Sequence, residues 1–144
     1  NKRIVKKSEI DFDYRKSSFD NEQIIIAARF KIQKLNKLQI KKKISIISNK
    51  RKRSQPVSTR TGGSTFTNPV SYPAWKLIDE INYRGKQLGG AKVSNLHPNF
   101  LINIKNASSL DLEILGEEIK KKVWEKRKIN LKWELIRIGE FKKI

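Results

Sequence analysis

The stretch from Arg60 to Pro69, Arg-Thr-Gly-Gly-Ser-Thr-Phe-Thr-Asn-Pro, limits the possible fold more than any other part of the chain. Gly62 and Gly63 remove two side chains at one point, which permits a sharp turn or the close approach of a ligand to the backbone. Ser64 then presents a hydroxyl on that turn. Spacing alone leaves two interpretations open, because Gly-Gly-Ser before a short strand is also typical of an ordinary loop.

Composition narrows the class of protein. The 144 residues suffice for one domain with its own core. The absence of Cys excludes zinc ribbons, thiol nucleophiles and disulfide frameworks, and we expect no metal site. The chain has no Met and starts at Asn1, so we expect a removed leader or a C-terminal piece of a longer protein. The longest apolar run, Ile24 to Ala28, is too short to cross a bilayer, which predicts a cytoplasmic protein without membrane contact.

Positive charge is the strongest global signal. The chain carries 33 Lys and Arg against 14 Asp and Glu, a formal net charge of +19. Such a balance favours binding of anions, whether nucleic acid, an acidic membrane surface or a phosphorylated small molecule. Lysines are scattered through every segment, which weakens the case for nucleic acid. The one dense run, Lys50 to Arg53, fits either the end of a helix or a contact to phosphate.

Two elements are predicted before the Gly-Gly-Ser stretch. Apolar residues alternate from Ile24 to Ile32, which predicts a strand buried mainly on one face. From about Lys34 the apolar spacing becomes helical, and Gln55-Pro56 ends this helix because the residue before proline resists helical geometry.

Two further elements follow the stretch. A helix is predicted from Pro73, a residue suited to the first turn, and Gly85 marks a stop for this segment. Its apolar stripe consists of Ala74, Leu77, Ile78 and Ile81. The segment from Gly85 to Ser94 lacks P-loop spacing, and its paired glycines indicate close packing or ligand approach. Residues 99–104 are predicted to form a strand.

The last third predicts a helix followed by a strand. Ser108 or Ser109 can cap the helix, and its core stripe consists of Leu112, Leu115, Ile119 and Val123. Residues 131–138 then alternate, which predicts a strand in which Glu134 shares a face with Ile136 and Ile138. A strand carboxylate in that position is either functional or paired with a lysine at a sheet edge. The whole pattern predicts an α+β fold with a small mixed or antiparallel sheet covered by helices.

Five blocks of the sequence, in the same order, match a known family: Arg53-Ser54-Gln55-Pro56, Thr61 to Pro69, Ala74-Trp75-Lys76-Leu77-Ile78-Asp79, Gly85 to Ser94, and Leu131 to Gly139. Together they closely resemble the C-terminal part of the UDP-N-acetylenolpyruvoylglucosamine reductase (MurB) family. Upstream, Tyr14 to Phe19 looks like the family motif Tyr-Arg-x-Ser-x-Phe. The resemblance covers roughly residues 12 to 140.

The resemblance implies a flavoenzyme of peptidoglycan synthesis. In that family NADPH or NADH reduces FAD, which reduces the enolpyruvyl group of UDP-N-acetylglucosamine enolpyruvate. The family's proton-donating serine falls on Ser64, and its C-terminal catalytic glutamate falls on Glu134. The resemblance also implies that the backbone at Gly62 and Gly63 approaches the cofactor. A proton donor of this kind needs no histidine partner, because it forms no covalent bond.

Four residues are implied as substrate contacts. Asn68 matches a substrate-binding asparagine, and Tyr14 matches a tyrosine that helps to hold the diphosphate. Lys52 falls near a phosphate-contacting lysine, although its neighbours Arg51 and Arg53 leave the register open. His97 falls where the family places a polar substrate-side residue, and a histidine in a surface loop is the alternative.

Most of the family's flavin-binding region has no counterpart in this chain. The resemblance therefore implies that residues 1–33 are the end of the FAD-binding domain, residues 34–55 a connecting helix and residues 56–144 the substrate-binding domain. We expect that the chain alone neither holds flavin nor turns over, and that the missing FAD-binding domain is its partner. The rival hypotheses are a basic nucleic-acid-binding module, whose affinity would fall steeply with salt, and a degenerate remnant without activity.

Overall fold

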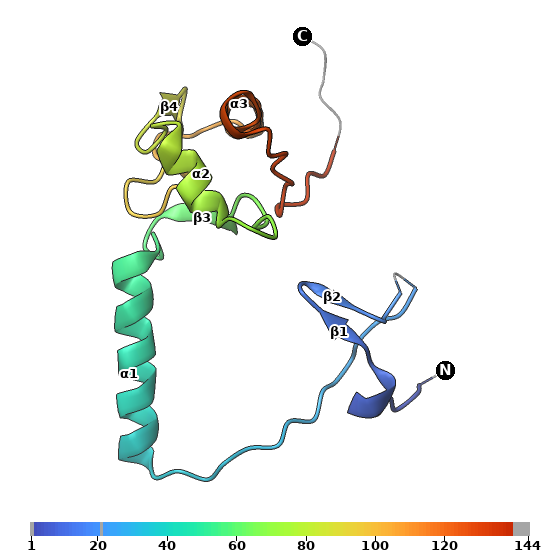
Figure 1. The fold of residues 1–144 in the computed structure, drawn as a ribbon. Coiled ribbons are helices and arrows are strands. Elements are labelled where there is room, and N and C mark those ends of the chain that lie inside the picture. Colours follow the sequence, from blue (N-terminus) through green and yellow to red (C-terminus); the bar gives the residue numbers. More distant parts are fainter. Residues whose placement is uncertain (1, 21, 140–144) are drawn as a thin grey trace. The chain divides into compact units, whose positions relative to one another are not determined.

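The computed structural model describes residues 2–20 and 22–139. The chain divides into two compact units between Asn36 and Lys37, and each is described by itself (Figure 1). In the described part of the first unit, the regular structure consists of a 3-10 turn, Lys7–Glu9, and a short hairpin of β1 (Phe12–Asp13) and β2 (Lys16–Ser17).

The strand predicted over residues 24–32 is wrong, because this segment has no regular structure. Its apolar side chains are exposed, with Ile24 at 86% and Phe30 at 78%. An alternating pattern becomes a strand only when a neighbouring strand satisfies its backbone groups and covers its apolar face. The described part of the first unit offers this segment no such neighbour.

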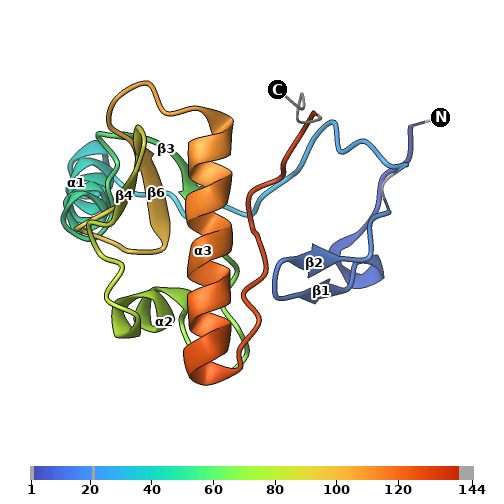
Figure 2. The same cartoon turned by 90° about the horizontal axis from the view of Figure 1, so that it is seen from above.

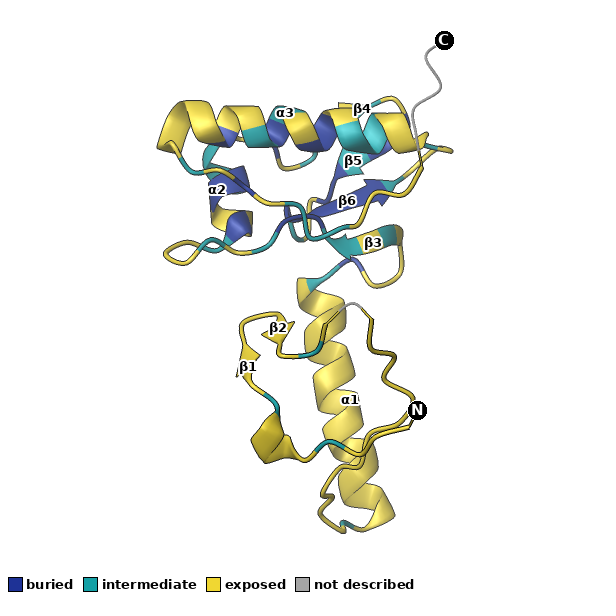
Figure 3. Ribbon diagram, turned by 90° about the vertical axis from the view of Figure 1, so that its right-hand side faces the viewer, coloured by how far each residue is buried: buried dark blue, intermediate teal, exposed yellow. Residues whose placement is uncertain are grey.

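The second unit begins with α1 (Lys37–Ser54), where a helix was predicted. None of its residues is buried, and it is drawn as exposed along its length in Figure 3. Arg51, Lys52 and Arg53 occupy its last turn, where cations complement the carbonyl end of the helix dipole.

The rest of the second unit is a four-stranded antiparallel sheet with helices packed on it. The strands are β3 (Arg60–Ser64), β4 (Gln87–Leu88), β5 (Ala91–Val93) and β6 (Phe100–Asn103), in the order β3-β6-β5-β4. The helices are α2 (Ala74–Glu80) and α3 (Ser109–Arg127). α3 contacts β4, β5 and α2, and Figure 2 shows it alongside the sheet, which confirms the predicted α+β class.

The core lies between α3 and the sheet. Leu115, Ile119 and Val123 of the predicted stripe are fully buried, whereas Leu112 is partly buried. They pack with Leu77 and Ile78 of α2 and with side chains of β5 and β6. Ser108 caps α3, because its hydroxyl accepts a hydrogen bond from the Asp111 amide and the Asp111 carboxylate accepts one from the Ser108 amide.

The strand predicted over residues 131–138 is also wrong. Only a single bridge forms, between Phe66 and Trp133. The amide of Thr67 donates to the carbonyl of Lys132 and the amide of Glu134 donates to the carbonyl of Thr65. Pairing stops there because the opposing chain continues as β3 in one direction and reaches a turn at Val70 and Ser71 in the other.

Candidate active site

Ser64 stands at the end of β3, directly after a break in the strand register. β3 pairs regularly with β6 at Thr61, and Ser64 pairs with Phe100 only after an irregularity. Gly63 lies within this bulge with φ of +100°, a conformation that glycine adopts without the steric cost of a side chain. The Thr61 hydroxyl supports the bulge, since it donates to the carbonyl of Leu101 and accepts from the Gly63 amide. The sequence therefore folds here into a bulge, after which the half-buried Ser64 resumes pairing opposite Phe100.

The backbone after Ser64 is clamped by two buried polar residues, Thr65 and Asn99. The Thr65 amide donates to the Asn99 carbonyl at 2.8 Å, and the Thr65 hydroxyl accepts from the Leu101 amide at 3.2 Å. The Asn99 side chain accepts from the Phe66 amide at 3.0 Å and donates to the Phe66 carbonyl at 2.8 Å. Sequence reasoning assigned no role of its own to either residue, because hydrogen bonds between segments 33 and 36 positions apart leave no local signal.

Glu134 lies beside this clamped segment. Its amide donates to the carbonyl of Thr65 at 2.8 Å, which places it one residue from Ser64 in the register. Glu134 is half-buried and its Oε2 atom is inaccessible to solvent. The structure thus brings the backbone of Glu134 beside the residue that follows Ser64, although Ser64 and Glu134 are 70 positions apart in the chain.

The two glycines before Ser64 have different surroundings. A methyl group at Gly62 would meet Leu135 Cδ2 at 3.1 Å, so this glycine makes room for Leu135. A methyl group at Gly63 would meet no atom of the described residues within 4 Å. The open side of Gly63 fits the approach of a flat cofactor ring to the backbone beside Ser64. Cofactor binding by Gly62 and Gly63 stays a prediction.

His97 is connected to the site through Phe100, the register partner of Ser64. The two rings meet edge to face, with centroids 4.9 Å apart. His97 Nδ1 is buried and finds no hydrogen-bond partner among the described residues. Burial lowers the pKa of the imidazole, and the positive charge of the Arg84 guanidinium lowers it further. The negative charge of Asp79 acts in the opposite direction and raises the pKa. Burial therefore favours the neutral form of the His97 imidazole.

Three other residues were implied as substrate contacts. The Asn68 side chain accepts from the Ala74 amide at 2.9 Å and so satisfies the first turn of α2, which Pro73 leaves without a side-chain cap. Lys52 is exposed on the last turn of α1. Tyr14 belongs to the first unit, where the residue is 57% exposed and its ring lies under the Arg15 guanidinium. Substrate contacts by these three residues stay predictions.

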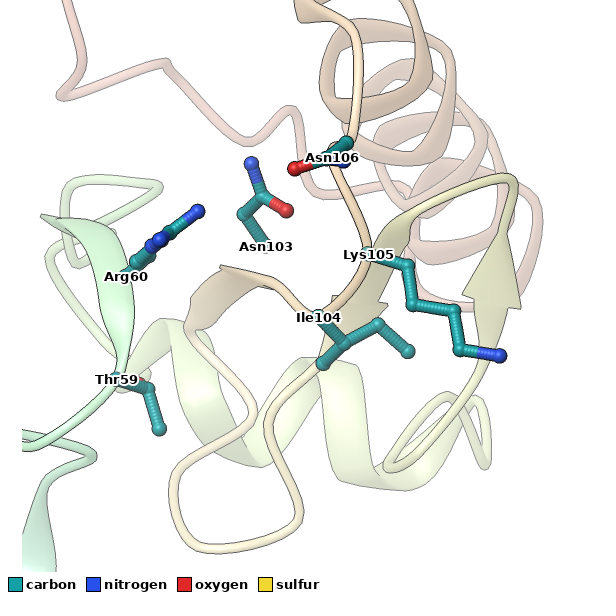
Figure 4. A pocket seen from close by; sticks show the side chains of 6 residues that line it. All are labelled: Thr59, Arg60, Asn103, Ile104, Lys105 and Asn106. Carbon is teal, nitrogen blue, oxygen red and sulfur yellow. The ribbon is translucent and has the colours of Figure 1, made fainter.

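A cavity lies away from Ser64. It measures about 540 Å³ and lies at the opposite end of β3, where Arg60 extends toward Asn103 and Lys105 points away (Figure 4). Its lining residues are Thr59, Arg60, Asn103, Ile104, Lys105 and Asn106. Within residues 2–20 and 22–139 no group of His, Cys, Asp and Glu side chains could hold a metal ion. No helix of this part of the chain is long and apolar enough to span a membrane.

Comparison with known proteins identifies the family to which the chain belongs. The chain is 44% identical over 133 residues to the UDP-N-acetylenolpyruvoylglucosamine reductase of Rickettsia prowazekii, which covers 92% of this chain and 45% of the relative. The reductase of Novosphingobium aromaticivorans is also 44% identical, over 92% of this chain and 44% of the relative. The chain therefore spans about half the length of these curated relatives.

A solved structure supports the same family. The crystal structure of UDP-N-acetylenolpyruvylglucosamine reductase from Thermus caldophilus superposes with a TM-score of 0.70 at 32% identity, over 88% of this chain and 46% of the other. Residues 55–138 match the family described as the C-terminal domain of UDP-N-acetylenolpyruvoylglucosamine reductase. The chain thus belongs to the UDP-N-acetylenolpyruvoylglucosamine reductase family, and its second unit carries the C-terminal domain of that family.

Proposed function

We propose that this chain is the substrate-binding part of an FAD-dependent UDP-N-acetylenolpyruvoylglucosamine reductase of peptidoglycan synthesis in the cytoplasm. The observation that carries the proposal is the hydrogen bond from the Glu134 amide to the Thr65 carbonyl, which fixes Glu134 one residue from Ser64. A serine on a glycine bulge beside a half-buried carboxylate supplies what reduction of an enolpyruvyl double bond needs besides hydride.

In this proposal bound FAD supplies the hydride chemistry, from NADPH to one carbon of the enolpyruvyl double bond. The Ser64 hydroxyl gives a proton to the other carbon, so that hydride and proton together reduce the double bond. Glu134 acts as the second residue on the acid side of the reaction. The clamp formed by Thr65 and Asn99 keeps the Ser64 hydroxyl in place before substrate arrives, which lowers the cost of orienting it.

The remaining residues contact either the substrate or the cofactor. Lys52 and Tyr14 contact the diphosphate of UDP-N-acetylglucosamine enolpyruvate, while Asn68 and the neutral His97 contact polar groups of the substrate. Gly62 and Gly63 let the backbone approach the flavin. We further propose that residues 1–33 complete a flavin-binding domain, residues 34–55 connect it, and residues 56–144 bind substrate, so that this chain alone neither holds flavin nor turns over.

The test joins the chain to the preceding portion of the Rickettsia prowazekii reductase, which this chain does not match. The flavin is bleached anaerobically with NADPH, with NADH in parallel, and the enolpyruvyl UDP-sugar is then added. Recovery of the yellow colour that slows by about 10²-fold or more in Ser64→Ala supports the reaction and the proton donor. Bound flavin that never recovers its colour in the unsubstituted protein contradicts the proposal.

The nucleic-acid alternative is measured on the chain alone. A basic module using Lys50 to Arg53 would bind DNA or RNA with an affinity that falls steeply with salt. The curated relatives and the solved structure named above are all reductases by name. We therefore expect only weak, nonspecific binding in this assay.

A further inference from the structure

The segment that carries Glu134 forms one bridge to Phe66 instead of a strand, so the ladder alone does little to hold it. The side chains on either side of Glu134 also hold this segment in place. Trp133, on one side of Glu134, packs on Gly116 of α3 and on Phe66, and Leu135, on the other side, packs on Gly62. Each flanking side chain therefore sits at a position where a glycine leaves space.

The contact between Trp133 and Gly116 is the tighter of the two. Gly116 is buried within α3, and a methyl group added there would overlap Cη2 and Cζ2 of the Trp133 indole. The indole Nε1 donates to Glu117 Oε1 at 2.6 Å, and the ring lies 5.0 Å from the Phe66 ring between centroids. The indole thus contacts Gly116 and Glu117 of α3 as well as the Phe66 ring.

A glycine in the middle of a helix is itself informative. Glycine costs about 1 kcal/mol relative to alanine in a helix interior, so its presence there calls for a packing reason. The neighbouring core positions of α3 carry Leu115 and Ile119, both fully buried. Within the described part of α3, Gly116 is the one position where an indole from another segment fills the space of a side chain.

We propose that Trp133 and Gly116 are positioning residues for Glu134, which together fix where its carboxylate stands relative to Ser64. The inference rests on the proposed function, in which Glu134 acts in the reaction. Neither Trp133 nor Gly116 touches substrate in this account. They act by setting the register of residues 132–134 against residues 65–67, which is recorded in the hydrogen bond from the Glu134 amide to Thr65.

The first test uses the chain alone and measures amide hydrogen exchange. Gly116→Ala favours helix formation in α3, so the helix persists while the indole is displaced. We expect the Glu134 amide to exchange about tenfold faster or more, because it loses its fixed partner on Thr65, while amides of β5 and β6 keep their protection. Ile114→Ala, an exposed position of the same helix, is the matched control and leaves the Glu134 amide unchanged.

A second pair of variants separates this contact from general damage. Trp133→Leu removes the ring that occupies the space at Gly116, and it releases the Glu134 amide in the same way. Because both substitutions break one contact, Gly116→Ala adds nothing further in the Trp133→Leu background. Additive effects of the two substitutions, or full protection of the Glu134 amide in Gly116→Ala, would overturn the proposal.

The second test uses the joined protein described above and separates the two halves of the reaction. Glu134 has no part in bleaching by NADPH, so Gly116→Ala leaves that rate unchanged. The rate of recolouring by the enolpyruvyl UDP-sugar falls by about 10²-fold, the size of effect that a displacement of about 1 Å produces. Equal slowing of both rates, or faster amide exchange with unchanged recolouring, would overturn the positioning role. If the unsubstituted protein never recolours, the proposed function fails, and the exchange data alone decide whether Trp133 sets the position of Glu134.

Discussion

Asn99→Ala is expected to destabilise the second unit strongly. Asn99 is only 4% exposed, and its side chain satisfies both the amide and the carbonyl of Phe66. Each buried backbone group left without a partner costs about 1–3 kcal/mol, and some of this is recovered if water enters the space. We therefore expect the free energy of unfolding to fall by about 3 kcal/mol.

The assay is urea unfolding of the chain, followed by far-ultraviolet circular dichroism. With an m value of about 1.5–2 kcal/mol/M, a loss of this size lowers the urea midpoint by about 1.5–2 M. Asn130→Ala is the matched control, because Asn130 is exposed and surface substitutions change stability by about 0.5 kcal/mol or less. A midpoint for Asn99→Ala that equals the control midpoint would refute the clamp as the structure presents it.

Three further predictions follow from single residues. Hydrogen bonds from the Ser108 and Gly90 amides lower the pKa of Asp111. The carboxylate therefore stabilises the fold above its unfolded pKa, and this contribution is lost as pH falls through the lower folded pKa. Asp111→Asn should flatten the acid side of the pH–stability curve measured by thermal melting. Burial lowers the pKa of His97, so its imidazole should titrate below about 6.5 in NMR spectra, whereas a midpoint at or above that value would contradict its burial. His97 favours the folded state fully above the unfolded pKa and loses this contribution as pH falls through the folded pKa, so His97→Gln should show a smaller loss of stability between pH 7 and 5. Gly63→Ala forces a side chain to φ of +100° and should lower the melting temperature, although the added methyl group meets open space; an unchanged melting temperature would mean that the bulge relaxes freely.

The helices of the second unit could be predicted because their signals are local. α3 has a capping serine at Ser108 and a stripe of apolar residues at helical spacing, and both survive in the structure. α2 likewise begins directly after Pro73. These signals depend on residues within one or two turns of each other, so the sequence contains all the information they need.

The two strands that were predicted and do not form had the right alternation. Residues 24–32 and 131–138 alternate apolar and polar side chains, but a strand also requires a partner, which local sequence does not specify. The position of Glu134 was predictable only through the resemblance to a known family. The features that hold it, Asn99 against Phe66 and Trp133 against Gly116, join residues far apart in the chain and leave no local pattern.

The central claim is that Ser64 and Glu134 together serve the reduction of an enolpyruvyl UDP-sugar. It is tested most directly by adding this substrate anaerobically to the joined protein after its flavin has been bleached by NADPH, with Ser64→Ala and Glu134→Gln alongside. We predict that the yellow colour returns in the unsubstituted protein and that recolouring, but not bleaching, slows by about 10²-fold or more in each variant. Recolouring at the unsubstituted rate in both variants would contradict the account.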